Sequence, residues 1–139
     1  MNSRLNMTLR ERNGIAYNVE ANYTPYTDTG IFMVYFGTEL SNLYRALQLV
    51  EHEFSIFREK KMGTIQLSKA KKQLIGQLAI SNENREDLML TLGRSYLYFD
   101  KVDSLSTVVE KIEKITAEDI FRVANEMLDK DRLSKLIFQ

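Results

Sequence analysis

The spacing of apolar residues changes along this chain from helical to alternating and back to helical. Leu5 and Leu9 lie four residues apart, which predicts a short helix over residues 3–12. Ser3 can cap the start of this helix, and Gly14 can take the left-handed conformation that ends it. The chain therefore opens with one short, capped helix.

The next two apolar segments predict an antiparallel hairpin. From Ile15 to Tyr23, apolar and polar residues alternate, as in a strand with one wetter face. Residues 31–36 are apolar on both faces, which is typical of a strand in the middle of a sheet. Between them, residues 24–30 are rich in the residue types that form turns.

From residue 41 onward, apolar residues recur at steps of three and four, which indicates a series of amphipathic helices. The helices are expected over residues 41–61, 65–79, 84–99, 105–112 and 117–128. Thr116 to Asp119 resembles a capping box at the start of the last one. Leu133 to Phe138 reads as a closing strand. The predicted fold class is α+β, with an antiparallel sheet (the hairpin plus the late strand) packed by several helices.

A sheet of three strands is small for so much helix. We therefore expect residues 1–139 to be a single domain that lacks its N-terminal strands, with Met1 an internal residue or cut point of a longer protein. Missing strands would leave a bare sheet edge, and bare edges pair with one another. This predicts a homodimer of the chain.

Composition narrows the function classes. The chain has 139 residues, 44 % of them apolar and 27 % charged, as in a soluble globular protein. Lys+Arg and Asp+Glu both number 19, so the basic footprint of a nucleic-acid binder is absent. No apolar run reaches the roughly 18 residues of a membrane span. The absence of Cys excludes disulfides and thiolate zinc sites, and leaves the compartment open between cytoplasm and periplasm.

Histidine content argues against a catalytic metal site in this chain. The single histidine is His52, whereas a zinc peptidase helix carries two in an H-E-x-x-H or H-x-x-E-H spacing. A catalytic zinc takes three protein ligands plus water. We therefore expect His52 to be a surface residue, this chain to bind no metal, and the chain to be inactive by itself.

The most specific signal spans residues 3–17, which read S-R-L-x-x-x-L-R-E-x-x-G-I-A-Y. This segment resembles the C-terminal, non-metal-binding half of the pitrilysin/insulinase family of zinc metallopeptidases, whose zinc-binding domain carries an inverted H-x-x-E-H motif. Three further blocks resemble the family in the same order: residues 26–32, 67–74 and 115–120. Four ordered blocks are more specific than any one of them.

The resemblance implies a mechanism divided between two domains. A partner domain, in the same polypeptide or in a separate subunit, would hold zinc in H-x-x-E-H and activate water, with its Glu as general base. This half would bind an extended peptide substrate, and the family's substrate-binding Arg and Tyr match Arg10 and Tyr17. Because the chain reverses at Gly14, both side chains can face one cleft. There they could donate hydrogen bonds to a carbonyl oxygen that gains negative charge.

Other interpretations stand beside this one. From the local pattern alone, Arg10 is a solvated helix residue and Tyr17 packs in the core on the apolar strand face. The chain could also be a scaffold relative of the family without a peptidase role, or an unrelated α+β binding module. In every case, no catalytic residue is expected within this chain.

Overall fold

The computed structural model describes residues 3–138, so the expectation about Met1 lies outside the described residues. The chain divides into two compact units. The described part of the first unit comprises residues 3–25, 30–61 and 121–138, and the second comprises residues 26–29 and 62–120. Helices and one antiparallel sheet confirm the α+β class. A single domain over 1–139 stays a prediction.

The predicted N-terminal helix is present, but most of it is a π-helix. A short α1 (Arg4–Asn6) continues directly into the π-helix η1 (Met7–Arg12). Ser3 caps the start, since its Oγ accepts the Asn6 backbone N–H at 3.2 Å. Gly14 has a φ of 61°, which confirms the predicted left-handed exit.

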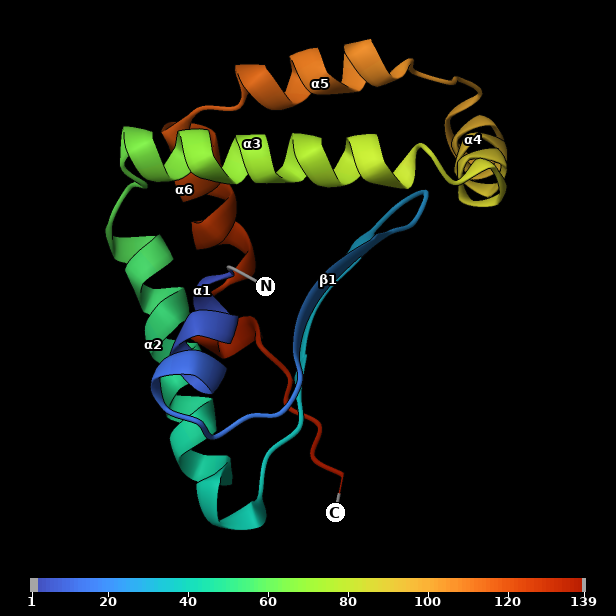
Figure 1. Cartoon of the computed structure of the whole chain (residues 1–139). Helices are drawn as coiled ribbons and strands as arrows, with labels where there is room; N and C mark the ends of the chain where they lie inside the picture. The colour runs from blue at the N-terminus through green and yellow to red at the C-terminus, as the bar shows by residue number, and fades with distance from the viewer. Residues whose placement is uncertain (1–2, 139) are drawn as a thin grey trace. The chain divides into compact units, whose positions relative to one another are not determined.

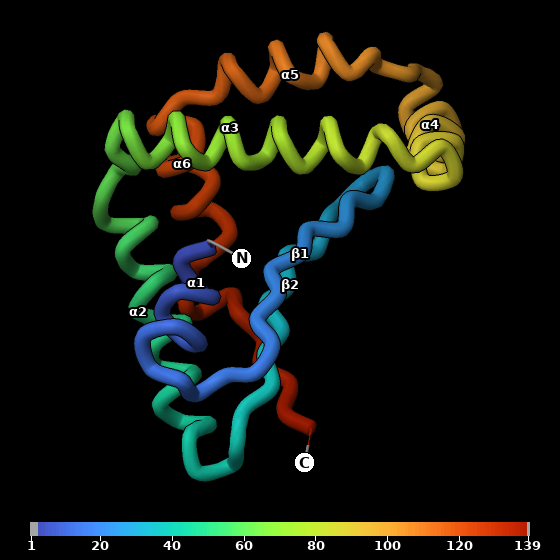
Figure 2. Tube along the Cα trace, in the orientation of Figure 1, coloured from blue at the N-terminus to red at the C-terminus, as the bar shows by residue number. Residues whose placement is uncertain are grey.

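The predicted hairpin is also present. Strands β1 (Val19–Pro25) and β2 (Gly30–Phe36) pair antiparallel, in a register that runs from Val19 opposite Phe36 to Pro25 opposite Gly30. Figure 2 shows the two strands side by side along their length. The expectation that residues 31–36 are covered on both faces is wrong for the described chain, because Ile31, Met33 and Tyr35 are each about half exposed. Apolar side chains reveal a need for burial but not the element that provides it.

The predicted closing strand at Leu133 to Phe138 does not form. Within residues 3–138 the sheet has two strands, and the C-terminal segment is without regular structure. The backbone at Leu133 is extended (φ −88°, ψ 127°), and its side chain packs beside the core. Alternation favours an extended backbone, but a strand also needs a hydrogen-bonded neighbour, and no described segment pairs with this one.

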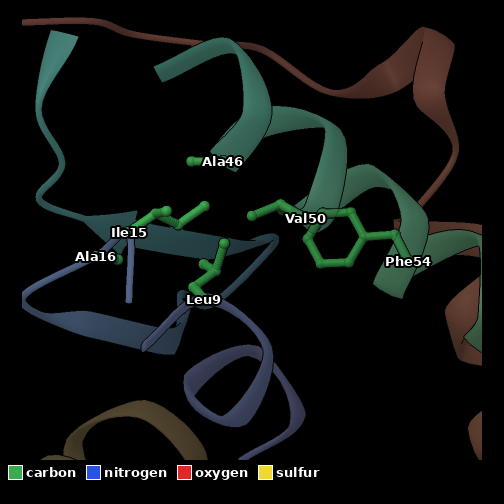
Figure 3. Close-up of a cluster of buried hydrophobic side chains, with 6 residues drawn as sticks. All are labelled: Leu9, Ile15, Ala16, Ala46, Val50 and Phe54. Carbon is green, nitrogen blue, oxygen red and sulfur yellow. The ribbon is translucent and has the colours of Figure 1, made fainter. Parts of the chain in front are cut away.

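The core of the first unit lies between the N-terminal segment and α2 (Leu43–Glu59), which follows the short 3₁₀ turn η2 (Leu40–Asn42). Figure 3 shows Leu9 and Ile15 pointing toward the side of α2 that carries Ala46 and Val50. Leu9 is fully buried. Burying a side chain of this size stabilises the fold by about 1.5–3 kcal/mol, so this contact fixes how residues 9–16 lie on the helix.

The second unit is helical. It contains α3 (Thr64–Ser81), α4 (Arg85–Phe99), α5 (Leu105–Lys114) and the first turn of α6 (Ala117–Met127). Helices α3 and α5 lie side by side (Figure 1), and Lys71 Nζ on α3 donates to the Glu113 carbonyl at 2.7 Å. Thr116 and Asp119 form the predicted capping box, each accepting the other's backbone N–H.

A 3₁₀ turn, η3 (Lys130–Arg132), follows α6. None of the helices within residues 3–138 combines the length and apolar character needed to cross a membrane.

Candidate functional site

The segment between Arg10 and Tyr17 is fixed at its base by two backbone hydrogen bonds. Ile15 N–H donates to the Leu9 carbonyl and Gly14 N–H donates to the Arg10 carbonyl, both at 3.0 Å. Each bond reaches back one residue further than in the usual Schellman end of an α-helix, as the wider π-helix requires. Residues 9 and 15 are thereby tied together, one residue from Arg10 and two from Tyr17.

Arg10 presents an accessible guanidinium. Its side chain is 48 % exposed, and the Nε lies 3.8 Å from Oε1 of its chain neighbour Glu11. At that distance and exposure the pair contributes little. Arginine carries five N–H donors, so most of them are open to a ligand. The π-helix that carries Arg10 is a rare element that occurs frequently at functional sites.

Tyr17 is exposed, so the interpretation that it packs in the core is wrong. Its relative exposure is 71 %, whereas Ile15 and Ala16 before it are both buried. Two consecutive buried residues break the predicted alternation. The reason is that β1 begins at Val19, and residues 15–18 form an irregular connection to which a period of two does not apply.

The phenol of Tyr17 donates a hydrogen bond to Oε1 of Glu39 at 3.0 Å. The hydrogen bond and the negative charge of Glu39 raise the pKa of Tyr17 above its ordinary value of 10.0. Tyr17 is therefore protonated at neutral pH and acts as a hydrogen-bond donor.

Backbone bonds hold the Tyr17 and Glu39 segments against each other. Tyr17 N–H donates to the Gly37 carbonyl at 3.0 Å, and Gly37 N–H donates to the Asn18 carbonyl at 3.2 Å. The Thr38 hydroxyl donates to the Ile15 carbonyl at 2.5 Å. These three bonds extend the pairing of the two segments beyond the Val19–Phe36 end of the hairpin. They fix the backbone positions from which the Tyr17 and Glu39 side chains extend.

Sequence reasoning missed the buried carboxylate of Glu53, which binds the helix that carries Arg10. Glu53 on α2 is only 6 % exposed, and its two oxygens accept from Arg4 Nε at 2.8 Å and from the Thr8 hydroxyl at 2.7 Å. The Arg4 guanidinium also lies 5.0 Å from the centre of the Phe57 ring. Arg4 of the S-R-L motif therefore anchors the N-terminal helix to α2.

A signal for this anchor is present in the sequence. Glu53 follows Ala46 and Val50 on the core-facing side of the helix by steps of four and three, where a charge requires a partner. Arg4 and Thr8 are spaced i, i+4, so a single helix face carries both donors.

The residues present do not fit a zinc ion. Within residues 3–138, no group of three or more His, Cys, Asp or Glu side chains is arranged to hold a metal. His52 is exposed, as expected. Two cavities of about 320 and 390 Å³ are lined by residues other than Arg10 and Tyr17. What Arg10 and Tyr17 offer is hydrogen-bond donors on an open surface; a common cleft for both stays a prediction.

Sequence comparison finds a family described as the peptidase M16 inactive domain, which matches residues 1–74. The chain is 25 % identical over 137 residues to the uncharacterized zinc protease YmxG of Bacillus subtilis, covering 99 % of this chain and 34 % of that protein. It is 31 % identical over 123 residues to mitochondrial-processing peptidase subunit alpha-2 of Dictyostelium discoideum, covering 88 % of this chain and 27 % of that subunit. The chain thus spans about a third or less of the curated relatives it matches.

Solved structures agree with the sequence match. A peptidase M16 inactive domain from Pseudomonas fluorescens superposes with a TM-score of 0.76 at 26 % identity, over 91 % of this chain and 30 % of that one. A chain of complex III2 from Candida albicans superposes with a TM-score of 0.79 at 19 % identity, over 91 % of this chain and 30 % of that one. The second likeness shows the fold alone.

Proposed function

Because this chain belongs to the M16 family of zinc peptidases and matches its inactive domain, we propose that it is the substrate-facing, metal-free part of such a peptidase. The match confirms the resemblance to the pitrilysin/insulinase family. In the proposal the chain binds an extended peptide and orients the bond to be cut, while a separate H-x-x-E-H domain supplies the hydrolytic chemistry.

The observation that carries the proposal is the exposure of Arg10 and Tyr17 on either side of a buried, hydrogen-bonded base. Both side chains are accessible, and the Leu9–Ile15 hydrogen bond ties their two segments together. Leu9, Ile15 and Ala16 are buried in one core cluster, so the segment is locked to α2. Such a fixed base is what positioned donors require, because their benefit depends on being aligned before the substrate arrives.

The role of the two side chains follows from their chemistry. A guanidinium and a phenol can both donate to a peptide carbonyl oxygen, and the donation strengthens as that oxygen gains charge. In this proposal neither group acts as nucleophile or base, and the activation of water takes place in the partner domain. The zinc-binding partner could be a domain of the same polypeptide or another protein, since one relative is named as a subunit.

The hairpin offers a place for the peptide backbone. Strand β1 begins two residues after Tyr17, and in the part of the chain that is described each strand pairs on one side only. An extended peptide can add to such an edge through backbone hydrogen bonds. Tyr23 and Tyr35 are more than half exposed on the two strands and would supply apolar contact.

The test uses the peptidase assembled with its zinc-binding partner. We expect Arg10→Ala and Tyr17→Phe each to lower turnover by about 10²–10³ while the thermal midpoint stays within a few degrees. Matched controls are Arg12→Ala, on the same π-helix, and Tyr44→Phe, which removes an equally exposed phenol. Unchanged kinetics in both site variants would refute the role, and loss of all hydrolysis with a zinc chelator would establish that the assembly is a metallopeptidase.

A scaffold role is the second candidate, and the Arg4–Glu53 anchor favours it. This contact gives Arg4, one residue of the family motif, a packing role. Under this alternative, Arg10 and Tyr17 would have no role in hydrolysis. Reading the gene upstream of this segment, and its neighbour, for H-x-x-E-H followed by a distant Glu separates the two: its presence favours the peptidase and its absence from both favours the scaffold.

A further inference from the structure

Glu39 lies where a helix cap is expected, but it does not act as one. It occupies the N-cap position of η2, directly before α2, and its side chain makes no capping hydrogen bond. The short carboxylate of an Asp at this position would accept backbone N–H groups of the turn. Here the carboxylate accepts the phenol of Tyr17 instead.

The Tyr17 bond is the one polar contact of the Glu39 side chain within residues 3–138. Among these residues Glu39 forms no ion pair, and its side chain is exposed. The backbone bonds from Tyr17 to Gly37 and from Thr38 to Ile15 hold the two residues together. Among the described residues, the Tyr17 phenol is thus the single polar partner of the Glu39 carboxylate.

We propose that Glu39 is a positioning residue that holds the proton of the Tyr17 phenol and makes Tyr17 donate to substrate only when the carbonyl oxygen has gained charge. This inference rests on the proposed function of Tyr17. A phenol has a single O–H donor, so it serves either Glu39 or the peptide at one time.

Competition between two acceptors, the Glu39 carboxylate and the substrate carbonyl oxygen, determines when Tyr17 donates its hydrogen bond to the substrate. A hydrogen bond to a carboxylate is charge-assisted and stronger than one to a neutral carbonyl, so a bound peptide leaves the Tyr17–Glu39 pair intact. An oxygen that carries developing negative charge in a site closed to water is a stronger acceptor than the solvent-exposed Glu39 carboxylate. Tyr17 would then transfer its hydrogen bond late in the reaction, which stabilises the transition state without tightening substrate binding.

Removing Glu39 has a defined kinetic consequence. In Glu39→Ala the phenol is free to bind the neutral carbonyl, so KM falls. The free enzyme no longer has a bond to break, so kcat/KM rises by about two- to fivefold, the range of an exposed charged pair. In a Tyr17→Phe background, Glu39→Ala should change neither quantity, because the pair is already absent. Glu20→Ala is the matched control, since Glu20 is an exposed carboxylate on β1 that bonds Asn18.

A second readout is independent of hydrolysis. With ¹³C-labelled tyrosine, NMR titration of the intact protein should show the pKa of Tyr17 falling toward 10.0 in Glu39→Ala and unchanged in Glu20→Ala. An identical Tyr17 titration in wild type and Glu39→Ala overturns the inference, as does a rise in kcat/KM that persists in the Tyr17→Phe background. If Tyr17→Phe alone leaves turnover unchanged, the proposed function fails instead, and the titration still decides whether the pair exists.

Discussion

Arg4 Nε lies 2.8 Å from Oε2 of Glu53, 49 residues further along the chain. The carboxylate is 8 % exposed at the side-chain level and the arginine 40 % exposed, so the pair sits at the margin of the core. The second oxygen of Glu53 is taken by Thr8. One buried charge therefore fastens α1, through Arg4, and the start of η1, through Thr8, to α2.

Replacing Arg4 should destabilise the fold more than replacing an ordinary surface arginine. Arg4→Met keeps much of the side-chain length but leaves Glu53 with Thr8 alone, which we expect to cost about 1–3 kcal/mol. The control is Arg122→Met, which removes an exposed i, i+4 pair with Glu126 and should cost at most about 0.5 kcal/mol. Urea unfolding of both variants measures the difference, and equal midpoints would contradict the anchoring role of Arg4.

Two glycines should respond to alanine with opposite signs. At Gly14 an added Cβ would meet open space, so the whole cost of Gly14→Ala is the left-handed backbone at φ 61°, about 1–2 kcal/mol. Gly76 lies inside α3 and is equally free of neighbours, so Gly76→Ala should stabilise by about 0.5–1 kcal/mol.

Thermal unfolding of the two glycine variants checks the signs. Because neither substitution meets a steric neighbour, the comparison isolates backbone conformation. Stabilisation by both substitutions would mean that Gly14 does not hold a left-handed conformation in solution, and that the turn between Arg10 and Tyr17 is formed differently.

Stability should fall in acid partly through Glu51. The hydrogen bond from Lys135, with help from Lys130, lowers the pKa of Glu51 below its ordinary 4.5. A carboxylate whose pKa is lowered on folding stabilises the protein above its ordinary pKa, and this contribution disappears as the pH falls through the lowered value. Glu51→Gln should therefore show a flatter dependence of thermal midpoint on pH below about 5.

Salt provides the control for the Glu51 prediction. At about 1 M ionic strength the screening length is about 3 Å, so an exposed pair loses most of its effect and the two pH profiles should converge. Parallel profiles for wild type and Glu51→Gln at low salt would show that the lysine contacts have no influence on folding.

The sequence pattern predicted the elements well where local chemistry decides them. Ser3, Gly14 and the Thr116–Asp119 box act on groups a few residues away, so their roles can be read without the fold. The strand expected at Leu133 to Phe138 failed because a strand depends on a distant partner. The exposed face of β2 was unpredictable for the same reason: covering a strand is a property of other elements.

The residues of the candidate site were likewise predictable only in part. The family resemblance selected Arg10 and Tyr17, and the structure shows both to be accessible. Glu39 was missed because it lies 22 residues from Tyr17, in a segment with no motif that links it to the site. Its contact with the phenol exists only because β1 and β2 bring the two segments together, and no spacing rule along the chain encodes that pairing.

The π-helical turn at Met7–Arg12 has a consequence for how this segment tolerates length changes. A π-helix uses one more residue per hydrogen-bonded turn than an α-helix, so losing one residue there would restore ordinary helical bonding. Everything on the N-terminal side of the loss would then rotate by about 100° about the helix axis. Arg4 would turn away from α2 if residues after the deletion kept their places. The shorter helix would then have regular backbone hydrogen bonds but would lose its Arg4–Glu53 contact with α2.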